Sequence, residues 1–241
     1  TERRNGCLHS HPIQERRIIL QGGLVEMRSR FDEELALLHR ELIEMGSLCE
    51  EVITLVTKAL LTADFSLVKK VSALDQQIDQ KERAVEAMCL RLLLQQQPVA
   101  RDLRQISAAL KMITDMERIG DQAQDIAELV MLLQGQRGES TDTLAQMAQA
   151  TIHMVTDSVE AYVKTDLSLA KKVVQDDDIV DTFFTQERQL LIEAIAENPT
   201  QSEYAVDYLM IAKYYERIGD HAANIAEWVI FSVTGEHEGG D

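Results

Sequence analysis

The feature that most constrains this fold is that the chain repeats itself. The segment 64–71 (DFSLVKKV) recurs as 166–173 (DLSLAKKV), 102 residues later, and Pro98 has a counterpart 101 residues later. The pentapeptide ERIGD stands at 117–121 and again at 216–220, 99 residues later. Three matches in the same order at nearly constant separation indicate a tandem duplication. Each half of the chain is therefore expected to fold into the same unit.

Apolar residues follow one another at steps of three and four from about residue 33 onward. That period places them on one face of an α-helix and is typical of long helices that pack side by side. Breaks in the pattern predict that the first helix ends near Ala63, that Ser66 caps the second, and that the third runs from Pro98 to about Leu133. Because the connections are short, neighbouring helices must be antiparallel. We predict an all-α fold of two tandem, antiparallel three-helix bundles that lie side by side.

The two repeats are expected at residues 27–133 and 140–234. Residues 1–26 show no sustained apolar period and contain Pro12 and a Gly-Gly pair. We therefore exclude them from the fold, as an upstream extension or a disordered tail. Residues 235–241 are expected to form a flexible tail at the other end.

The composition excludes several classes of function. The chain has 41 acidic and 24 basic residues, a formal net charge of −17, which repels nucleic acid and anionic lipid. No apolar run approaches the ~20 residues that a membrane-spanning helix needs, so direct membrane insertion is not expected. The three cysteines are widely spaced and fit a reducing compartment. These features predict a soluble, acidic cytoplasmic protein.

Carboxylates form a stripe along the third helix of each repeat. At 100° per residue, Glu117, Asp121, Asp125 and Glu128 fall within an arc of about 80°, away from the apolar face. In the second repeat Glu216, Asp220 and Glu227 keep the stripe, and Asn224 stands where Asp125 stood. The second helices carry their own acids: Asp75, Asp79, Glu82 and Glu86 in the first repeat, and Asp177 and Asp181 in the second. If neighbouring helices are antiparallel, each repeat presents one cluster of oxygen ligands.

Such clusters suit hard cations, namely Mg²⁺, Mn²⁺, Ca²⁺ or ferric iron. Like charges four residues apart cost a few tenths of a kcal/mol per pair, which a cation would offset. A solvated acidic face that binds nothing is the alternative interpretation. The chain contains neither a Glu-x-x-His pair nor a Gly-rich phosphate loop, so the sequence offers no catalytic constellation. His221 lies off the stripe and is interpreted as a surface or packing residue.

The doubled pattern Glu-Arg-Ile-Gly-Asp-x-Ala-x-Asp/Asn-Ile-Ala-Glu resembles the signature of the PhoU family of phosphate-uptake regulators. The preceding QPVARDLR segment at 97–104 is also similar to that family's entry into the third helix. The resemblance covers 27–234 and implies two three-helix bundles that carry multinuclear metal clusters, with iron as the expected metal and Mn, Mg or Ca as alternatives. The implied ligands are Asp75, Asp79, Glu117, Asp121, Asp125, Asp177, Asp181, Glu216, Asp220 and Asn224. The change from Asp125 to Asn224 makes the second cluster the weaker match.

The resemblance also implies what the protein does. Family members act as cytoplasmic negative regulators of the phosphate-starvation response. They link the ATPase subunit of the high-affinity phosphate ABC transporter to a sensor histidine kinase. The resemblance therefore implies a non-enzymatic adaptor, and we expect it to form a homodimer. Two alternatives remain open from the residues themselves: a carboxylate-bridged metalloenzyme, such as a phosphohydrolase, and a helical interaction module without metal.

Overall fold

The computed structural model describes residues 12–95, 99–133 and 141–236. Within these ranges the chain forms long helices and no strand, which confirms the predicted all-α class. The helices are α1 (Pro12–Thr62), α2 (Val68–Gln95), α3 (Ala100–Leu133), α4 (Thr141–Lys164), α5 (Leu167–Glu197) and α6 (Ser202–Thr234), with short 3-10 turns η1 (Phe65–Leu67) and η2 (Pro199–Gln201). None of the described helices is long and apolar enough to span a membrane.

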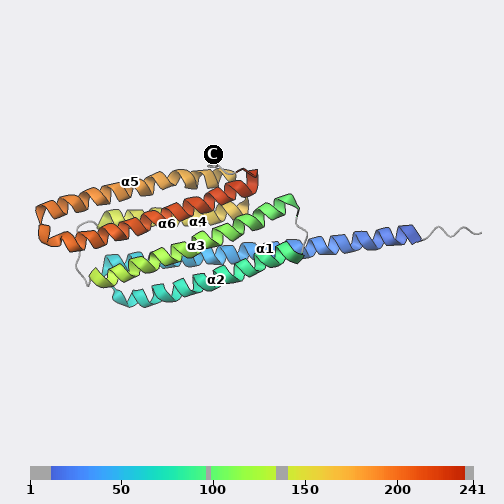
Figure 1. Cartoon of the computed structure of the whole chain (residues 1–241), viewed down its shortest axis with the longest axis horizontal. Helices are drawn as coiled ribbons and strands as arrows, with labels where there is room; N and C mark the ends of the chain where they lie inside the picture. The colour runs from blue at the N-terminus through green and yellow to red at the C-terminus, as the bar shows by residue number, and fades with distance from the viewer. Residues whose placement is uncertain (1–11, 96–98, 134–140, 237–241) are drawn as a thin grey trace, which may run out of the picture.

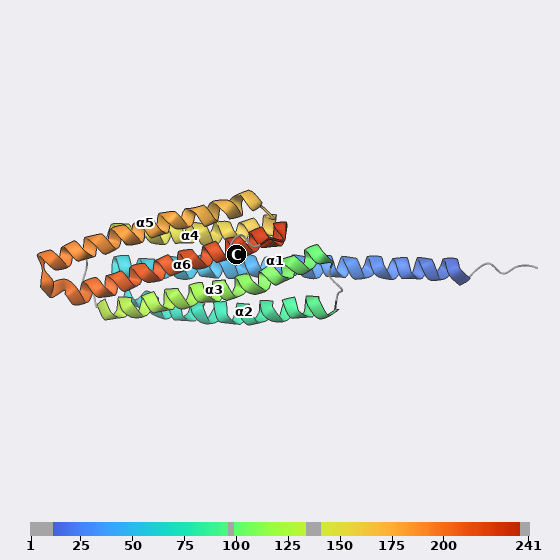
Figure 2. The same cartoon turned by 45° about the horizontal axis from the view of Figure 1, so that its top comes forward.

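The start of the chain differs from the sequence expectation. α1 begins at Pro12 and passes through the Gly-Gly pair, so residues 12–26 are helical and not a disordered tail. In Figures 1 and 2 this part of α1 projects beyond the other helices. Pro12 suits the first turn because the N–H that it lacks would have no helical partner there. Most of the residues that follow are good helix formers, so this segment can be helical without a periodic apolar face. Residues 1–11 and 237–241, to which the remaining tail predictions apply, lie outside the described residues.

The first two helices meet in a tight turn at the predicted place. α1 ends at Thr62, and Ala63 adopts a left-handed backbone with φ of 53°. The expectation that Ser66 caps the second helix is wrong: Ser66 lies inside the turn η1, which Asp64 caps and which runs directly into α2. The Asp64 carboxylate accepts hydrogen bonds from the Ser66 backbone N–H at 3.1 Å and from its hydroxyl at 2.6 Å. A carboxylate accepts several bonds at once, so Ser66 serves as the donor.

The corresponding turn of the second repeat is built in the same way. Thr165 has φ of 57°, and its N–H bonds the Tyr162 carbonyl at 3.1 Å. The Asp166 N–H bonds the Ala161 carbonyl at 2.8 Å, which completes a Schellman ending for α4. The Asp166 side chain then accepts the Leu169 N–H at 3.0 Å and caps α5.

The third helix of each repeat follows a connection that contains a proline. α3 begins at Ala100 and ends at Leu133, the predicted end; Pro98 and the predicted break after Leu133 lie outside the described residues. In the second repeat Pro199 opens the turn η2, and α6 follows directly. α6 ends at Thr234, where Gly235 takes a φ of +81° and bonds the Phe231 carbonyl at 2.8 Å.

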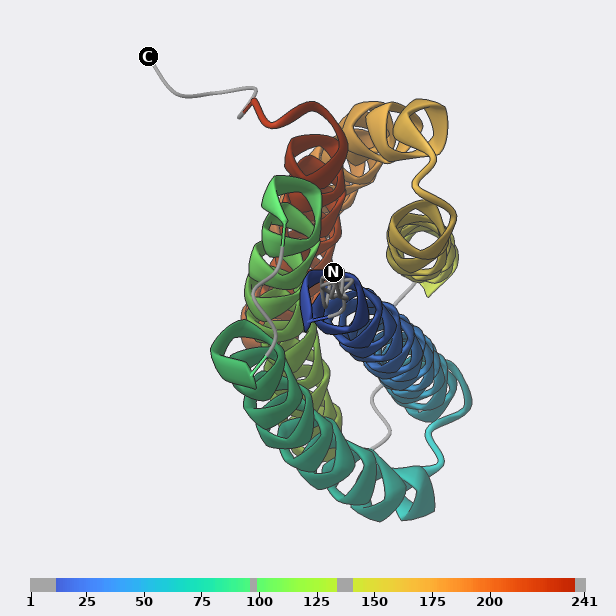
Figure 3. The same cartoon turned by 90° about the vertical axis from the view of Figure 1, so that its right-hand side faces the viewer.

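The two bundles lie side by side, α1–α2–α3 against α4–α5–α6, as predicted. α3 packs along α6, and α1 packs along α4. In the end-on view of Figure 3, α3 and α6 lie between α2 and α5. α3 and α6 are antiparallel: Arg104 of α3 bonds the Ser232 carbonyl near the end of α6, and Asp115 farther along α3 meets His221. This contact relates the repeats by an approximate twofold axis: α2 ends and α3 begins at one end of the molecule, and α5 passes into α6 at the other (Figures 1 and 2).

We predict that Asp166→Ala lowers the free energy of unfolding by about 1 kcal/mol, because the Leu169 N–H loses its acceptor. Urea denaturation followed by circular dichroism measures this change. Asp166→Asn keeps an acceptor in place and should retain most of the stability. Equal losses in the Ala and Asn variants would show that the charge of Asp166, and not its cap, stabilises the turn.

Candidate functional site

The predicted ligands of the first repeat come together where α2 packs along α3. Asp75 and Asp79 lie on α2, and Glu117, Asp121 and Asp125 lie on α3. The negative charges of Asp79, Asp121 and Asp125 raise the pKa of Asp75. Those of Asp121 and Asp79 raise the pKa of Glu117. We call these five residues the first acidic cluster. The sequence placed them on two stripes, and the structure brings the stripes side by side.

A glycine in the middle of α3 permits this close packing. A Cβ atom on Gly120 would lie only 3.0 Å from Asp75 Oδ1 and 3.2 Å from Ile78 Cδ1. Both contacts would be tighter than nine in ten real Cβ contacts, so a larger residue would require Asp75 and Ile78 to shift by a few tenths of an ångström. Asp75 Oδ1 is itself buried and has no hydrogen-bond partner. The cluster therefore contains a desolvated carboxylate oxygen that the protein leaves unsatisfied.

The electrostatics show how crowded the carboxylates are. Burial, followed by the charges of Asp79, Asp121 and Asp125, raises the pKa of Asp75 to about 6. Burial and the Asp121 charge also raise the pKa of Glu117. The pKa of Asp125 is raised by burial and then by Glu128 and Asp121. Mutual repulsion of this kind disfavours the ionised cluster unless cations neutralise it.

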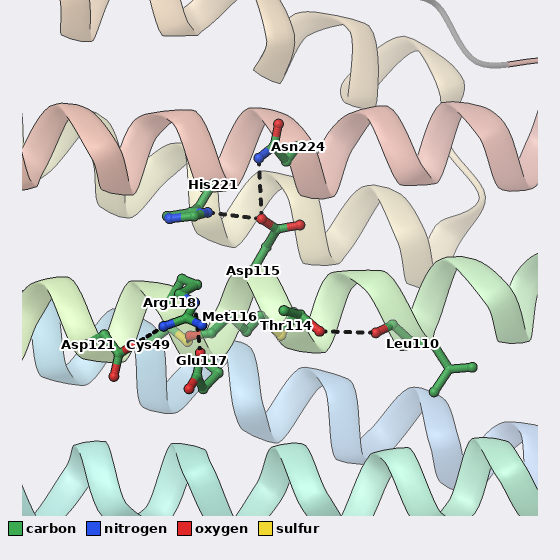
Figure 4. A network of polar contacts seen from close by, with 10 residues as sticks. All are labelled: Cys49, Leu110, Thr114, Asp115, Met116, Glu117, Arg118, Asp121, His221 and Asn224. Carbon is green, nitrogen blue, oxygen red and sulfur yellow. Dashed lines mark hydrogen bonds and ion pairs between the residues drawn. The ribbon is translucent and has the colours of Figure 1, made fainter. Parts of the chain in front are cut away.

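Basic side chains neutralise part of the cluster. Figure 4 shows Arg118 paired with Asp121 and Glu117. The distances to their oxygens are 2.8 Å and 3.4 Å, and Arg83 lies 3.7 Å from an Asp79 oxygen. As the side chains stand, the described residues include no group of three His, Cys, Asp or Glu side chains arranged to hold a metal ion. The atoms available to a metal ion are carboxylate oxygens, the ligand type that hard cations prefer. One of them, Asp75 Oδ1, has no hydrogen-bond partner. Metal binding would require Arg118 to leave Asp121 and Glu117.

The second repeat builds a corresponding group, the second acidic cluster, from Asp177 and Asp181 of α5 and Glu216 and Asp220 of α6. Burial, followed by the charges of Asp220, Asp181 and Glu216, raises the pKa of Asp177 to about 6. A Cβ on Gly219 would lie 3.2 Å from Asp177 Oδ1, so the glycine has the same role in both repeats. The basic partner differs: Lys213 of α6 pairs with Glu216.

Asn224, the tenth predicted ligand, points elsewhere. Its amide donates to Asp115 Oδ1 of α3 at 3.3 Å, and His221 Nδ1 lies 2.9 Å from the same oxygen. Figure 4 shows these two α6 side chains converging on Asp115 between the repeats. His221 and Asp115 are both mostly buried. This polar contact joins the two bundles, so the interpretation of His221 as a packing residue is close to what the structure shows.

The sequence analysis missed Asp115 because nothing in its own helix pattern marks it. A weak signal existed: the position of His221 is also polar in the first repeat, where Gln122 is buried in α3. A polar residue at the same position in both repeats is the signal that could have drawn attention to His221. Its partner could be named only once α3 was known to lie against α6.

We predict that Asp75→Asn stabilises the metal-free protein at pH 7 by about 1 kcal/mol, a figure already reduced for solvent screening. The pKa of Asp75 is about 6 in the folded chain and 3.8 as its ordinary value. Its protonation therefore stabilises the fold at low pH, and this contribution is lost as the pH rises through about 6. The advantage of the variant should shrink towards pH 4.

Urea denaturation in EDTA at several pH values tests this, with Glu51→Gln on the exposed face of α1 as the control for loss of one charge. A variant less stable than the wild type at every pH measured would show that the carboxylate of Asp75 is held by favourable contacts.

Comparison with known proteins confirms the resemblance noted in the sequence. The PhoU domain model matches residues 42–130 and 144–229. A "Phosphate-specific transport system accessory protein PhoU homolog" from Clostridium acetobutylicum is 34% identical over 211 residues, which is 87% of this chain and 96% of the relative. The crystal structure of PhoU from Pseudomonas aeruginosa superposes with a TM-score of 0.81 at 33% identity, over 86% of this chain and 100% of that one. For the phosphate transport system regulatory protein PhoU from Streptococcus pneumoniae, the TM-score is 0.79 at 28% identity, over 86% of this chain and 98% of that one. This chain therefore belongs to the PhoU family.

Proposed function

We propose that this chain is a regulatory accessory protein of phosphate transport that acts by binding partners and not by catalysis. The observation that carries the proposal is the 34% identity with an accessory protein of the phosphate-specific transport system over 96% of that protein's length. The match to that relative and to the family model covers both repeats of this chain. The regulatory name of the Streptococcus pneumoniae protein supports the same role.

In this proposal the chain restrains the phosphate-starvation response when phosphate is plentiful. It does so in the cytoplasm, by contacting the ATPase subunit of the phosphate ABC transporter and a sensor histidine kinase. Helices of 24 to 51 residues, packed as two related bundles, offer long faces to two different partners at once. Assembly as a homodimer and attachment to the membrane through these partners remain predictions.

The two acidic clusters are proposed to bind metal ions, with iron the first candidate. Asp75, Asp79, Glu117, Asp121 and Asp125 would hold them in the first repeat, and Asp177, Asp181, Glu216 and Asp220 in the second. A bound cation would supply the positive charge that offsets repulsion among these carboxylates. The raised pKa values of Asp75 and Asp177 and the unsatisfied Asp75 oxygen support this. Asn224, which already contacts Asp115, is the weakest of the proposed ligands.

Deletion of this chain's gene in its own host tests the regulatory role. A fluorescent reporter under a phosphate-starvation promoter should then be expressed at high phosphate, because nothing restrains the kinase. A plasmid copy of the gene should restore repression, and an empty plasmid should not. A deletion strain that still represses the reporter at high phosphate would contradict the proposal.

Metal content tests the clusters independently of regulation. Mass spectrometry of gently purified protein should find bound metal in the wild type and a loss of most of it in Asp121→Ala/Asp220→Ala, because each cluster loses a central carboxylate. The control Glu33→Ala/Glu51→Ala removes two exposed charges from α1 and should keep its metal. Equal metal content in all three proteins, with unchanged circular dichroism, would show that these carboxylates are not ligands.

A further inference from the structure

The contact between α1 and α4 contains a histidine at one of its ends. The two helices run in opposite directions, and near the middle of α1 a Cβ atom on Gly46 would lie only 3.0 Å from Val159 of α4. Closer to the start of α1, His39 lies against Tyr162 in the last turn of α4. The two ring centres are 5.5 Å apart, and the ring planes meet at 86°. His39 is therefore part of the surface that joins the first helices of the two repeats.

Tyr162 is held in place from two sides. Its side chain is buried, and its hydroxyl donates a hydrogen bond to the Gln105 carbonyl of α3 at 2.9 Å. Its own carbonyl accepts the Thr165 N–H at the end of α4. Burial, and after it the nearby Cys89 of α2, raises the pKa of Tyr162, so its hydroxyl stays protonated and keeps donating. The ring of His39 thus packs against a side chain that the rest of the molecule fixes.

His39 Nε2 is buried and has no hydrogen-bond partner among the described residues. The side chain as a whole is partly exposed, so a proton can reach the ring without unfolding of the chain. One turn away along α1 lie Leu35, Leu42 and Ile43, whose side chains accept no hydrogen bond, and the next residue, Arg40, is itself cationic. A neutral ring fits this position. A protonated ring would carry an N–H donor without an acceptor and a charge without water.

The helices around α1 provide no charge that offsets this cost within the described part of the chain. Burial lowers the pKa of His39, and no charged group of α2, α3 or α4 contributes to the change. On α4 the titratable neighbour is Tyr162, and behind it lies Cys89 of α2, whose pKa is raised to about 12 by burial and by Glu86. α3 presents the Gln105 carbonyl, which already accepts from Tyr162. Tyr162 and Cys89 are therefore neutral near pH 7 and cannot balance an imidazolium.

The opposite end of the α1–α4 contact lacks such a pair. At the repeat offset of 102 residues, Tyr162 corresponds to Leu60 and His39 corresponds to Thr141. Neither Leu60 nor Thr141 changes its charge with pH. A response to acid is thus expected only at the end of the contact that is nearer to the projecting part of α1 (Figures 1 and 2).

We propose that His39 makes this end of the α1–α4 contact sensitive to pH. When the ring is neutral, α1 packs against Tyr162. When the ring is protonated, the segment of α1 around His39 moves away from α4, so that water reaches Nε2. Gly46, about two turns further along α1, keeps its close contact with Val159, and the change ends there. This inference concerns the packing of α1 and does not rest on the proposed function.

The effect on stability has a definite sign. Because the pKa of His39 in the folded chain is below its ordinary value of 6.5, its contribution to stability is complete above about pH 6.5 and is lost as the pH falls through the folded pKa. Asp75 and Asp177, with pKa values of about 6, act in the opposite direction. A comparison of variants at each pH removes this shared background.

The variant His39→Gln tests the proposal, because glutamine is neutral at every pH and is a good helix former. Melting temperatures are measured by circular dichroism in EDTA at about pH 7.5 and about pH 5.5. Over this change the wild type should lose about 2 °C or more relative to His39→Gln. The matched control His153→Gln replaces an exposed histidine of α4 and should follow the wild type. Equal pH dependence in the wild type and His39→Gln would overturn the proposal.

Two further measurements use the wild type, so they do not depend on the stability of a variant. Hydrogen–deuterium exchange, corrected for the intrinsic effect of pH, should become several times faster in residues 35–44 at the lower pH, while residues 47–62 keep their protection. Exchange that changes equally in both segments, or in neither, would contradict the proposal. An NMR titration of the His39 ring should give a pKa below 6.5. A pKa above this value would show that the Tyr162 ring stabilises the imidazolium, and would also overturn the proposal.

Discussion

The antiparallel packing of α3 against α6 buries a further face of each of these two helices, beyond the face that packs in its own bundle. Each one forms part of the core of its own bundle, lies against the second helix of its repeat, and contacts its counterpart in the other repeat. Ile119 and Gly120, and likewise Ile218 and Gly219, are buried by these contacts. Ionised side chains remain favourable only where water or an opposite charge can reach them. The carboxylates of α3 and α6 are therefore concentrated on the outward stripes that remain, beside the stripes of α2 and α5. Close packing of the core thus crowds the negative charge.

The close packing around the acidic clusters is accompanied by the same unfavourable features in both repeats. Each central helix contains a buried glycine that is unfavourable for helix formation by about 1 kcal/mol relative to alanine. In return, a carboxylate of the neighbouring helix lies against its backbone: Asp75 beside Gly120, and Asp177 beside Gly219. Both carboxylates have raised pKa values, so their charge is opposed by their surroundings. The same unfavourable arrangement in two diverged repeats agrees with a site whose favourable partner is a cation.

Much of this architecture could be predicted from the sequence, because helices with one apolar face leave a clear period and a duplication leaves ordered matches. The stripes of the acidic clusters could also be predicted, since angular position on a helix depends only on residue number. The contact of Asp115 with His221 could not be predicted, because it depends on how the two bundles pack together. The residue pattern of neither helix contains that information. The cap at Asp64 and the helical residues 12–26 depend on local hydrogen bonding and helix propensity, to which the apolar period is insensitive.

The covalent joining of the two bundles has an evolutionary consequence. In a symmetric assembly of identical subunits, any substitution appears on both sides of the axis, so the two ends cannot acquire different preferences. Here corresponding positions carry Glu82 in the first repeat and Phe184 in the second, and likewise Asp125 and Asn224. Fusion has freed each half to drift separately while the shared scaffold holds their spacing and orientation. The two halves of the molecule therefore differ chemically, and a binding partner can distinguish one from the other.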